Sequence, residues 1–425
     1  MVIRLLLLLT LLVGPSAARP AAPPEWLPTV PLPGVDARAI AAAAPPAALP
    51  PLRHSDIGIG WDAPARGWVA VALRAIRIAD APPTRAARAL ALLSIGMDTA
   101  LAGNAASRGS GRDASDAAAL AGVAPALLRA SLPLLADEPL LADARDAALS
   151  AALASGASPS SAARGLTIGE ATAIAVLRAV ADDGAARAPR AEDDRSLAAP
   201  GRWSATPPMM LPGLDPQWGD VRPLLAAPLA EAAPPPAWDS QAFASSRASF
   251  AQTASRLTPD DRKLAQRYAF GMRSVTPPGA WFQTASDLLA AHPGTLRHEA
   301  RVFAALGATL NDAIIGCWRA KYRYRVARPI QWMRQRDQAW LPALTDTPPH
   351  PSYPSGHATI GGAASTVLAL FFPEARSSLT EMAEAGARSR ILGGIHWPID
   401  SDAGLDLGRR AAERSIVALN LGAYR

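Results

Sequence analysis

The chain has 425 residues, half of them hydrophobic, and a formal net charge of +6. Aromatic residues make up only 5% of the sequence and Ala-Leu runs are frequent, which favours helices over sheet. The positive charge comes almost entirely from arginines interleaved with Asp and Glu, without the basic run typical of nucleic-acid binding. We therefore expect an all-α protein that prefers small anions and has no nucleic-acid partner.

The first 18 residues have the pattern of a secretory signal peptide. Arg4 is followed by an apolar run and then by small residues, with a cleavage point expected after Ala18. About ten apolar residues are too few to span a bilayer, and no later segment predicts a stable membrane span. We therefore expect export, to a periplasm or to the medium. The single cysteine, Cys317, excludes an internal disulfide and is expected to be a buried thiol.

Composition divides the rest of the chain into four predicted segments. They are an Ala/Pro-rich lead-in over 19–50, an N-terminal helical bundle over 51–185, a Pro/Trp-rich connector over 186–240 and a catalytic helical bundle over 241–425. We expect four to six helices in the first bundle and an all-α fold of two packed bundles. The connector contains Trp203, Trp218 and Trp238, which predict that it is pinned to the core, because large apolar rings do not stay solvated.

The second bundle has the clearer helix signals. Thr276-Pro277-Pro278-Gly279 predicts a sharp turn before Trp281. Apolar spacing predicts a long helix over 298–325 and further helices over 357–372, 373–392 and 398–419. The pair Gly393-Gly394 is expected to end the third of these four helices. The sequence does not predict an oligomeric state.

Three short clusters in this bundle hold residue types suited to a tetrahedral oxyanion. They are Lys321 with Arg328, then Ser355-Gly356-His357, and finally Arg390 with His396 and Asp400. Each alone has a plainer interpretation, as a solvated basic face, an ordinary helix N-cap or a structural histidine. Their occurrence together predicts one shared site.

The first two clusters supply donors for oxygen atoms. Lys321 and Arg328 are seven residues apart, so they would share a face if the helix continued. Pro329 disfavours helix at Arg328, so we expect its guanidinium at a helix end, free to bind two oxygens. Ser355-Gly356 open an apolar helix whose first N–H groups attract an anion, and His357 enters that helix beside the same anion.

The third cluster supplies a second guanidinium and a reactive nitrogen. Arg390 is another forked donor, and His396 follows the Gly-Gly break. Asp400 can accept a hydrogen bond from one ring nitrogen of His396 and leave the other as a ligand or a nucleophile.

Together the clusters resemble the signature of the vanadium-dependent haloperoxidase and type 2 phosphatidic acid phosphatase superfamily, which is all-α. The resemblance implies that His396 ligates the vanadium or attacks phosphorus, and that His357 is the acid–base residue. It also implies vanadate as the cofactor, with phosphate or sulfate as alternative occupants. The residues that would bind the oxygens are Lys321, Arg328, Ser355, Gly356 and Arg390.

Further features resemble the bacterial haloperoxidase-like branch, among them Asn311-Asp312-Ala313 and the segment from Thr276 to Trp281. Trp318 and His350 are expected to tune the halide pocket, and His350 stands where bromide-oxidising members carry a histidine. The stretch 267–273 lacks the acidic residue that supports the acid–base histidine in this family. The sequence therefore does not identify what supports His357.

The resemblance implies an exported enzyme that uses hydrogen peroxide to oxidise a halide, bromide or iodide, which then reacts with a small organic acceptor. A phosphatase acting through a phosphohistidine at His396 is an alternative, because the same pocket suits that reaction. A non-catalytic oxyanion-binding protein is a second alternative.

Overall fold

The computed structural model describes most of the chain beyond the predicted signal peptide, which lies outside the described residues. The described residues are 29–44, 48–53, 56–107, 114–135, 138–187, 199–271, 273–344 and 346–424. Within them the chain forms fourteen α-helices and no β-strand, with one isolated bridge between Arg202 and Val326. The predicted all-α fold is confirmed.

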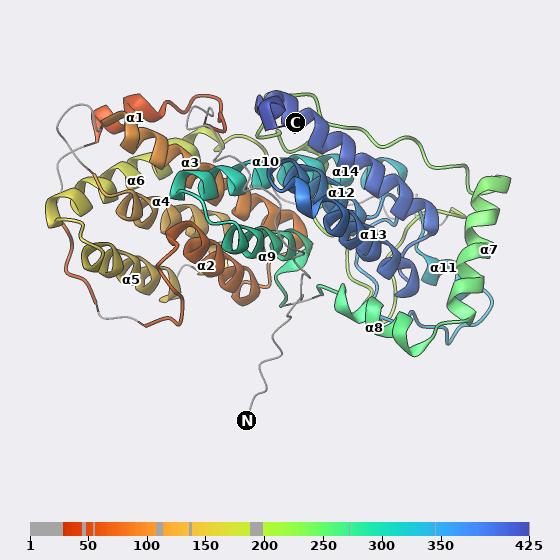
Figure 1. The fold of residues 1–425 in the computed structure, drawn as a ribbon. Helices are drawn as coiled ribbons and strands as arrows, with labels where there is room; N and C mark the ends of the chain where they lie inside the picture. The colour runs from red at the N-terminus through yellow and green to blue at the C-terminus, as the bar shows by residue number, and fades with distance from the viewer. Residues whose placement is uncertain are drawn as a thin grey trace.

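The N-terminal helices pack together on one side of the molecule (Figure 1). They are α1 (Ala37–Ala43), α2 (Pro64–Ile78), α3 (Pro83–Ser107), α4 (Asp116–Ser131), α5 (Leu140–Ala154) and α6 (Pro159–Ala179). Ser115 and Ser158 cap α4 and α6 by accepting backbone N–H groups, which explains where these helices begin. Helices α4 and α6 approach closely at Gly169, where an added Cβ would lie 2.1 Å from the carbonyl oxygen of Ala119. Glycine is therefore required at this crossing.

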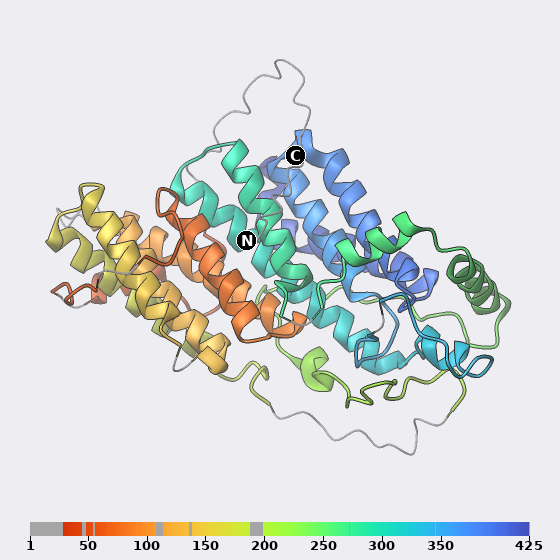
Figure 2. The ribbon, with the colours of Figure 1, turned by 90° about the horizontal axis from the view of Figure 1, so that it is seen from below.

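Two helices, α9 (Thr276–Ala291) and α10 (Leu296–Tyr324), lie between the N-terminal and C-terminal groups (Figures 1 and 2). Helix α10 packs against α3 on one side and against α12 and α14 on the other, so one apolar core runs across the molecule. Helix α9 begins at Thr276 itself, with φ +61°. The two prolines that follow lie in the first turn of this helix, where their missing N–H groups cost nothing. Residues 276–279 therefore belong to the helix itself, whereas the sequence predicted a separate turn before Trp281.

The C-terminal group carries the residues of the three clusters other than Lys321, which lies near the end of α10. Its helices are α7 (Gln241–Ser255), α8 (Pro259–Arg267), α11 (Pro329–Met333), α12 (Gly356–Phe371), α13 (Arg376–Leu392) and α14 (Pro398–Ala418). The predicted ranges of the last three agree within one to three residues. Helices α12 and α14 lie in close contact because Gly408 leaves no side chain between them, and an added Cβ there would meet the Thr359 carbonyl oxygen at 2.1 Å. This packing places the start of α14 beside the start of α12, where Ser355 N donates to the carbonyl oxygen of Asp400 at 2.8 Å.

The described part of the connector, 199–240, is anchored on the core. The rings of Trp203 and Trp218 are buried and that of Trp238 is half-buried. The Asp312 carboxylate on α10 accepts the backbone N–H groups of Leu224 and Leu225 at 2.9 and 3.0 Å. Connector and α10 therefore behave as one packed unit.

Two described helices are long and apolar enough to cross a bilayer, α3 over Pro83–Ala106 and α10. Of their most apolar windows, 83% and 100% respectively are buried inside the fold. Length and composition are therefore weak indications of a membrane span here, because buried core helices have the same properties. Cys317 lies on α10 as a buried free thiol, as predicted.

Candidate active site

The three clusters meet where α10 ends, α12 begins and the turn between α13 and α14 comes close. The side chains of Lys321, Arg328, Arg390, His396 and Asp400 are all buried there. Arg328 thus lies close enough to Lys321 and to Arg390 to repel both, and Asp400 is the carboxylate whose charge attracts Lys321 and Arg328. Buried cations need counter-charges, so this arrangement attracts an anion.

The orientation of His396 is fixed by Asp400. Gly394 has φ +80° and turns the chain after α13, and Pro398 begins α14, which brings Asp400 under the ring. His396 Nδ1 lies 2.9 Å from Asp400 Oδ2, which also accepts Trp397 N at 3.0 Å. Nδ1 is therefore the donor, and Nε2 carries the lone pair.

Burial and nearby cations keep His396 neutral. Burial lowers the pKa of its imidazole well below the ordinary value, and the charges of Arg328 and Lys321 lower it further. Burial also raises the pKa of Asp400 to about 6, although a hydrogen bond from Ser352 Oγ, 2.5 Å from Oδ2, opposes this rise. Sequence reasoning missed Ser352, because a single serine in a proline-rich loop carries no recognisable signal.

Arg328 lies directly against Nε2 of His396. Helix α10 ends at Tyr324, and Arg325 follows it with φ +50°, so Lys321 and Arg328 do not share a helical face. Arg328 instead precedes Pro329 as the N-cap of α11, at a helix end as predicted. Its Nη1 lies 3.2 Å from His396 Nε2 and donates to the carbonyl oxygen of Ile395 at 2.6 Å. Burial lowers its pKa to about 10.

The Lys321 ammonium is held by backbone carbonyls. Its Nζ lies 2.8, 3.0 and 2.6 Å from the carbonyl oxygens of Pro351, Ser352 and Pro354. These three bonds use all its N–H groups, so Lys321 fixes the loop that leads to Ser355. Burial, with Arg328 nearby, lowers the pKa of Lys321 to about 7. Direct contact of Lys321 with an oxyanion stays a prediction, because one carbonyl must first release an N–H group.

The start of α12 lies beside this loop and carries a buried side-chain nitrogen without a hydrogen-bond partner. Ser355 is its N-cap, accepting Ala358 N at 3.5 Å, so the plainer interpretation of this serine holds, and its donation to an oxyanion stays a prediction. Gly356 lies next to the Trp318 ring, which an added Cβ would contact at 3.5 Å. His357 Nε2 has no contact with solvent and no hydrogen-bond partner. A buried ring nitrogen without a partner is costly, so it indicates a place for a ligand.

His357 is supported by an aromatic ring and backbone carbonyls in place of a carboxylate. The Phe270 ring stacks on His357, with centroids 6.2 Å apart and an angle of 23° between the ring planes. Burial and the Arg390 charge lower the pKa of His357 well below its ordinary value, and hydrogen bonding with the Tyr268 and Ala269 backbone opposes this. Phe270 was missed because nothing in the sequence relates it to His357.

Arg390 holds the segment that supports His357. Its Nη2 donates to the Ala265 carbonyl oxygen at 3.0 Å and its Nη1 to that of Ala269 at 3.4 Å. Burial lowers the pKa of Arg390 to about 9, and Arg328 adds to this effect. The two guanidinium groups therefore influence each other across the site.

Trp318 and His350 form one wall. Their ring centroids are 5.0 Å apart, and Trp318 Nε1 donates to the Leu214 carbonyl oxygen at 3.1 Å. His350 Nδ1 lies 3.0 Å from Arg328 Nη2. The structure thus gathers every predicted site residue in one place: Trp318, Lys321, Arg328, His350, Ser355, Gly356, His357, Arg390, His396 and Asp400.

The donor set fits an oxyanion better than a bare metal ion. The described residues include no group of three His, Cys, Asp or Glu side chains that could hold a metal ion. Vanadate needs one nitrogen ligand for the metal and cationic donors for its oxygens. The Nε2 lone pair of His396, which Arg328 contacts, the unpartnered His357 Nε2 and three buried cations meet that need.

Comparisons with known proteins agree with this chemistry. Residues 301–417 match the family model of the PAP2 superfamily. A stretch of 88 residues is 34% identical to vanadium chloroperoxidase from Curvularia inaequalis. That match covers 17% of this chain and only 14% of the relative's length.

Two solved structures have the same fold over most of the chain. A crystal structure described as the first bacterial vanadium-dependent iodoperoxidase has a TM-score of 0.72 at 20% identity, covering 86% of this chain and 98% of that one. A holo-type bacterial vanadium-dependent chloroperoxidase has a TM-score of 0.53 at 14% identity, covering 90% and 97%. The predicted resemblance is therefore confirmed: residues 301–417, with all three clusters, match the PAP2 superfamily, within a fold shared with bacterial vanadium-dependent haloperoxidases.

Proposed function

We propose that this protein is a vanadate-dependent haloperoxidase that oxidises bromide or iodide with hydrogen peroxide. The observation that carries the proposal is the pair of contacts made by His396, whose Nδ1 lies 2.9 Å from Asp400 Oδ2 and whose Nε2 lies 3.2 Å from Arg328 Nη1. A nitrogen lone pair among buried cations is suited to ligate the metal of an oxyanion. When bound, vanadate would activate hydrogen peroxide toward a halide.

The protein's own groups would stabilise charge and move protons. Arg328 and the first N–H groups of α12 would bind anionic oxygens, and Arg390 would keep the positive potential high. His357, neutral because of burial, would take a proton at Nε2 and return it later in the cycle. Trp318 and His350 would form the halide-facing wall, since they lie beside Arg328.

A phosphatase is a second candidate, because the same lone pair would make His396 Nε2 a nucleophile toward phosphorus. His357 would then protonate the leaving oxygen. The resulting phosphohistidine would be the mark of that reaction. A pocket that binds the anion without turnover is the remaining alternative.

One pair of assays distinguishes these functions. Purified protein is assayed for bromination of phenol red with hydrogen peroxide and bromide, with and without added vanadate, beside hydrolysis of an aryl phosphate. The proposal requires bromination that depends on vanadate. Hydrolysis without bromination would replace the haloperoxidase by the phosphatase, and neither activity would leave an anion-binding protein.

Export is proposed on the pattern of residues 1–18, with Arg19 expected at the start of the secreted chain. Expression of the full chain in a bacterial host, followed by N-terminal sequencing of the secreted or periplasmic protein, tests this. Retention of Met1 in a cytoplasmic product would contradict it.

A further inference from the structure

Ser352, in the loop that leads to α12, joins two parts of the candidate active site. The residue is fully buried, and each of its three polar groups has a partner. Its backbone N–H donates to the Val326 carbonyl oxygen at 2.9 Å, and its own carbonyl oxygen accepts Lys321 Nζ at 3.0 Å. Its hydroxyl donates to Asp400 Oδ2 at 2.5 Å. One residue therefore contacts both the buried ammonium and the carboxylate that orients His396.

The Asp400 carboxylate is held through one of its two oxygens. Oδ2 accepts hydrogen bonds from Ser352 Oγ, His396 Nδ1 and Trp397 N, at 2.5, 2.9 and 3.0 Å. Oδ1 has no contact with solvent and no hydrogen-bond partner. His396 and Trp397 precede Asp400 by four and three residues, so these two donors move together with the carboxylate. Among the described residues, Ser352 is the donor that ties this side chain to a distant part of the chain.

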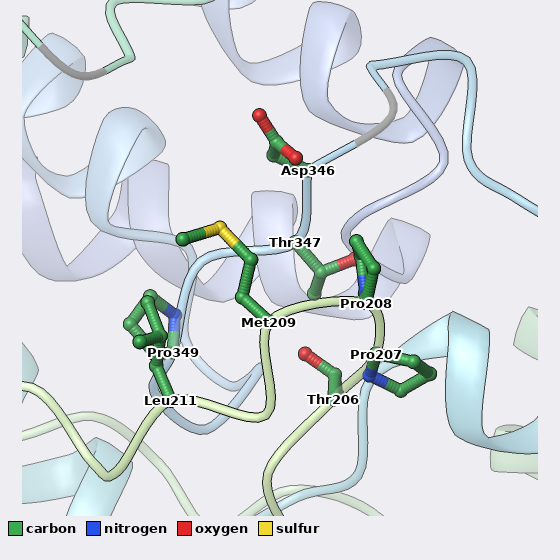
Figure 3. A pocket seen from close by; sticks show the side chains of 8 residues that line it. All are labelled: Thr206, Pro207, Pro208, Met209, Leu211, Asp346, Thr347 and Pro349. Atoms are coloured by element: carbon green, nitrogen blue, oxygen red, sulfur yellow. The ribbon is translucent and has the colours of Figure 1, made fainter.

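The loop that carries Ser352 is held in place from two sides. On the inner side, Lys321 Nζ donates to three of the loop's backbone carbonyl oxygens. On the outer side, the connector packs against the loop, and Leu214 N donates to the Pro349 carbonyl oxygen at 2.7 Å. Figure 3 shows the small hollow where the connector near Met209 lies opposite Pro349. The Ser352 hydroxyl is therefore presented to Asp400 from a fixed position.

The direction of the hydroxyl's hydrogen bond follows from its neighbours. Serine hydroxyls in loops commonly bond backbone groups a few residues away, whereas Ser352 reaches a side chain 48 residues further along the chain. Ser352 Oγ also lies 3.5 Å from His396 Nδ1, but the proton on Nδ1 is directed to Asp400 Oδ2 at 2.9 Å. The hydroxyl and the imidazole therefore both donate to the same oxygen, and the carboxylate is clamped between the loop and the ring.

We propose that Ser352 is a positioning residue for His396. Its hydroxyl fixes the rotation of the Asp400 carboxylate, and the carboxylate in turn holds the His396 ring with Nε2 toward Arg328. The ring is thereby aimed for ligation, while the same loop is held by Lys321. The consequence for vanadate rests on the proposed function, because it takes His396 Nε2 as the ligand of the metal.

Two anions separate the aiming of His396 from the general integrity of the pocket. Vanadate affinity includes a bond between the metal and Nε2, whereas the sulfur of sulfate takes no further ligand and sulfate is held through its oxygens alone. Ser352→Ala removes the hydroxyl and keeps the backbone groups that contact Val326 and Lys321. We therefore expect Ser352→Ala to weaken vanadate binding roughly 3- to 10-fold, the usual effect of one lost hydrogen bond, and to leave sulfate binding unchanged.

Both affinities are measured on the full chain without turnover, vanadate by equilibrium dialysis and sulfate by calorimetry. Ser415→Ala is the matched control, because Ser415 is also buried and its hydroxyl donates to the Ala411 carbonyl oxygen within α14. This control should bind both anions as the wild type does. Ser352→Thr keeps a hydroxyl and should restore most of the vanadate affinity that Ser352→Ala loses.

Three results would overturn the positioning role of Ser352. They are unchanged vanadate affinity in Ser352→Ala, equal losses for vanadate and sulfate, and tighter vanadate binding, which would mean that the hydroxyl competes with His396 for Asp400 Oδ2. The bromination assay distinguishes these failures from that of the proposed function. A selective loss of vanadate affinity in a protein that does not brominate would contradict the haloperoxidase and keep the positioning role. Vanadate-dependent bromination without such a selective loss would do the reverse.

Discussion

His396 Nδ1 and Asp400 Oδ2 lie 2.9 Å apart, and this contact relates the start of α14 to the chemistry of the site. Because Asp400 accepts the hydrogen bond from Nδ1–H, the reactive nitrogen of His396 is Nε2, which faces Arg328. Close packing of α12 and α14 keeps both residues under the N-terminus of α12.

Replacement of His396 by Ala should abolish vanadate binding, because it removes the proposed ligand to the metal. Asp400→Ala should weaken binding less, about 10- to 100-fold, as expected for a partner that orients a metal-bound histidine. Equilibrium dialysis measures both, with His292→Ala, which pairs with Glu374 outside the site, as the control. A larger effect of Asp400→Ala than of His396→Ala would reverse the two roles.

Anion binding should weaken as the pH rises above 7. The pKa of Lys321 in the free protein is about 7, and a bound anion favours the charged ammonium and so raises this pKa. Between the two values binding takes up a proton, so affinity falls by up to about tenfold per pH unit. Sulfate, whose charge is constant here, is the probe for calorimetry from pH 6 to 9.

Lys321→Met should remove this pH dependence, while Lys263→Met, at the exposed lysine of α8, should retain it. An unchanged slope in Lys321→Met would assign the proton to another group. Lys321→Arg should bind vanadate better than Lys321→Met yet lose turnover, because a planar guanidinium does not fit the three carbonyls that hold the ammonium.

Replacement of Phe270 by Leu should lower turnover and leave vanadate affinity unchanged, because the ring stacks on His357, whose proposed role is proton transfer. An aromatic contact of this kind contributes about 0.5–1.5 kcal/mol, so we expect a roughly 2- to 10-fold loss. Phe270→Tyr keeps the ring and should retain activity. The pH dependence of turnover distinguishes a specific loss of the contact with His357 from a general loss of structure. Only loss of this contact shifts the part of the pH profile that reports the pKa of His357. An equal loss in both variants without such a shift would remove Phe270 from the mechanism.

Gly408→Ala should destabilise the fold and disturb the site together. The added Cβ would meet the Thr359 backbone oxygen at 2.1 Å, so α12 and α14 must move apart. Overpacking of this kind costs roughly 1–3 kcal/mol of unfolding free energy. Gly422→Ala, where an added Cβ meets nothing within 4 Å, is the control for denaturant unfolding. Equal stability of the two variants would contradict the proposed role of this crossing.

Motif spacing was sufficient to predict the three clusters and the helices α12, α13 and α14, because Ser355, Gly393 and Pro398 mark helix ends through local backbone chemistry. The contacts that complete the site could not be predicted from spacing. Phe270 contacts His357 although the two residues are 87 positions apart in the sequence. The carbonyl oxygens that bind Lys321 belong to the backbone, so no residue type in the sequence indicates them. The end of α10 at Tyr324 was also misplaced slightly, since no glycine marks it.

The central claim is that the three clusters form one pocket that binds vanadate and catalyses bromide oxidation. The most direct test of it is the variant His357→Ala, assayed both for vanadate binding and for bromide oxidation. Its Nε2 has no partner within the protein, so loss of the ring should leave vanadate bound, within several-fold of wild-type affinity. Bromide oxidation by the vanadate-loaded protein should fall by roughly 10²–10⁴, the usual effect of a lost general acid–base group. Full bromide oxidation by His357→Ala, with vanadate bound, would contradict the account.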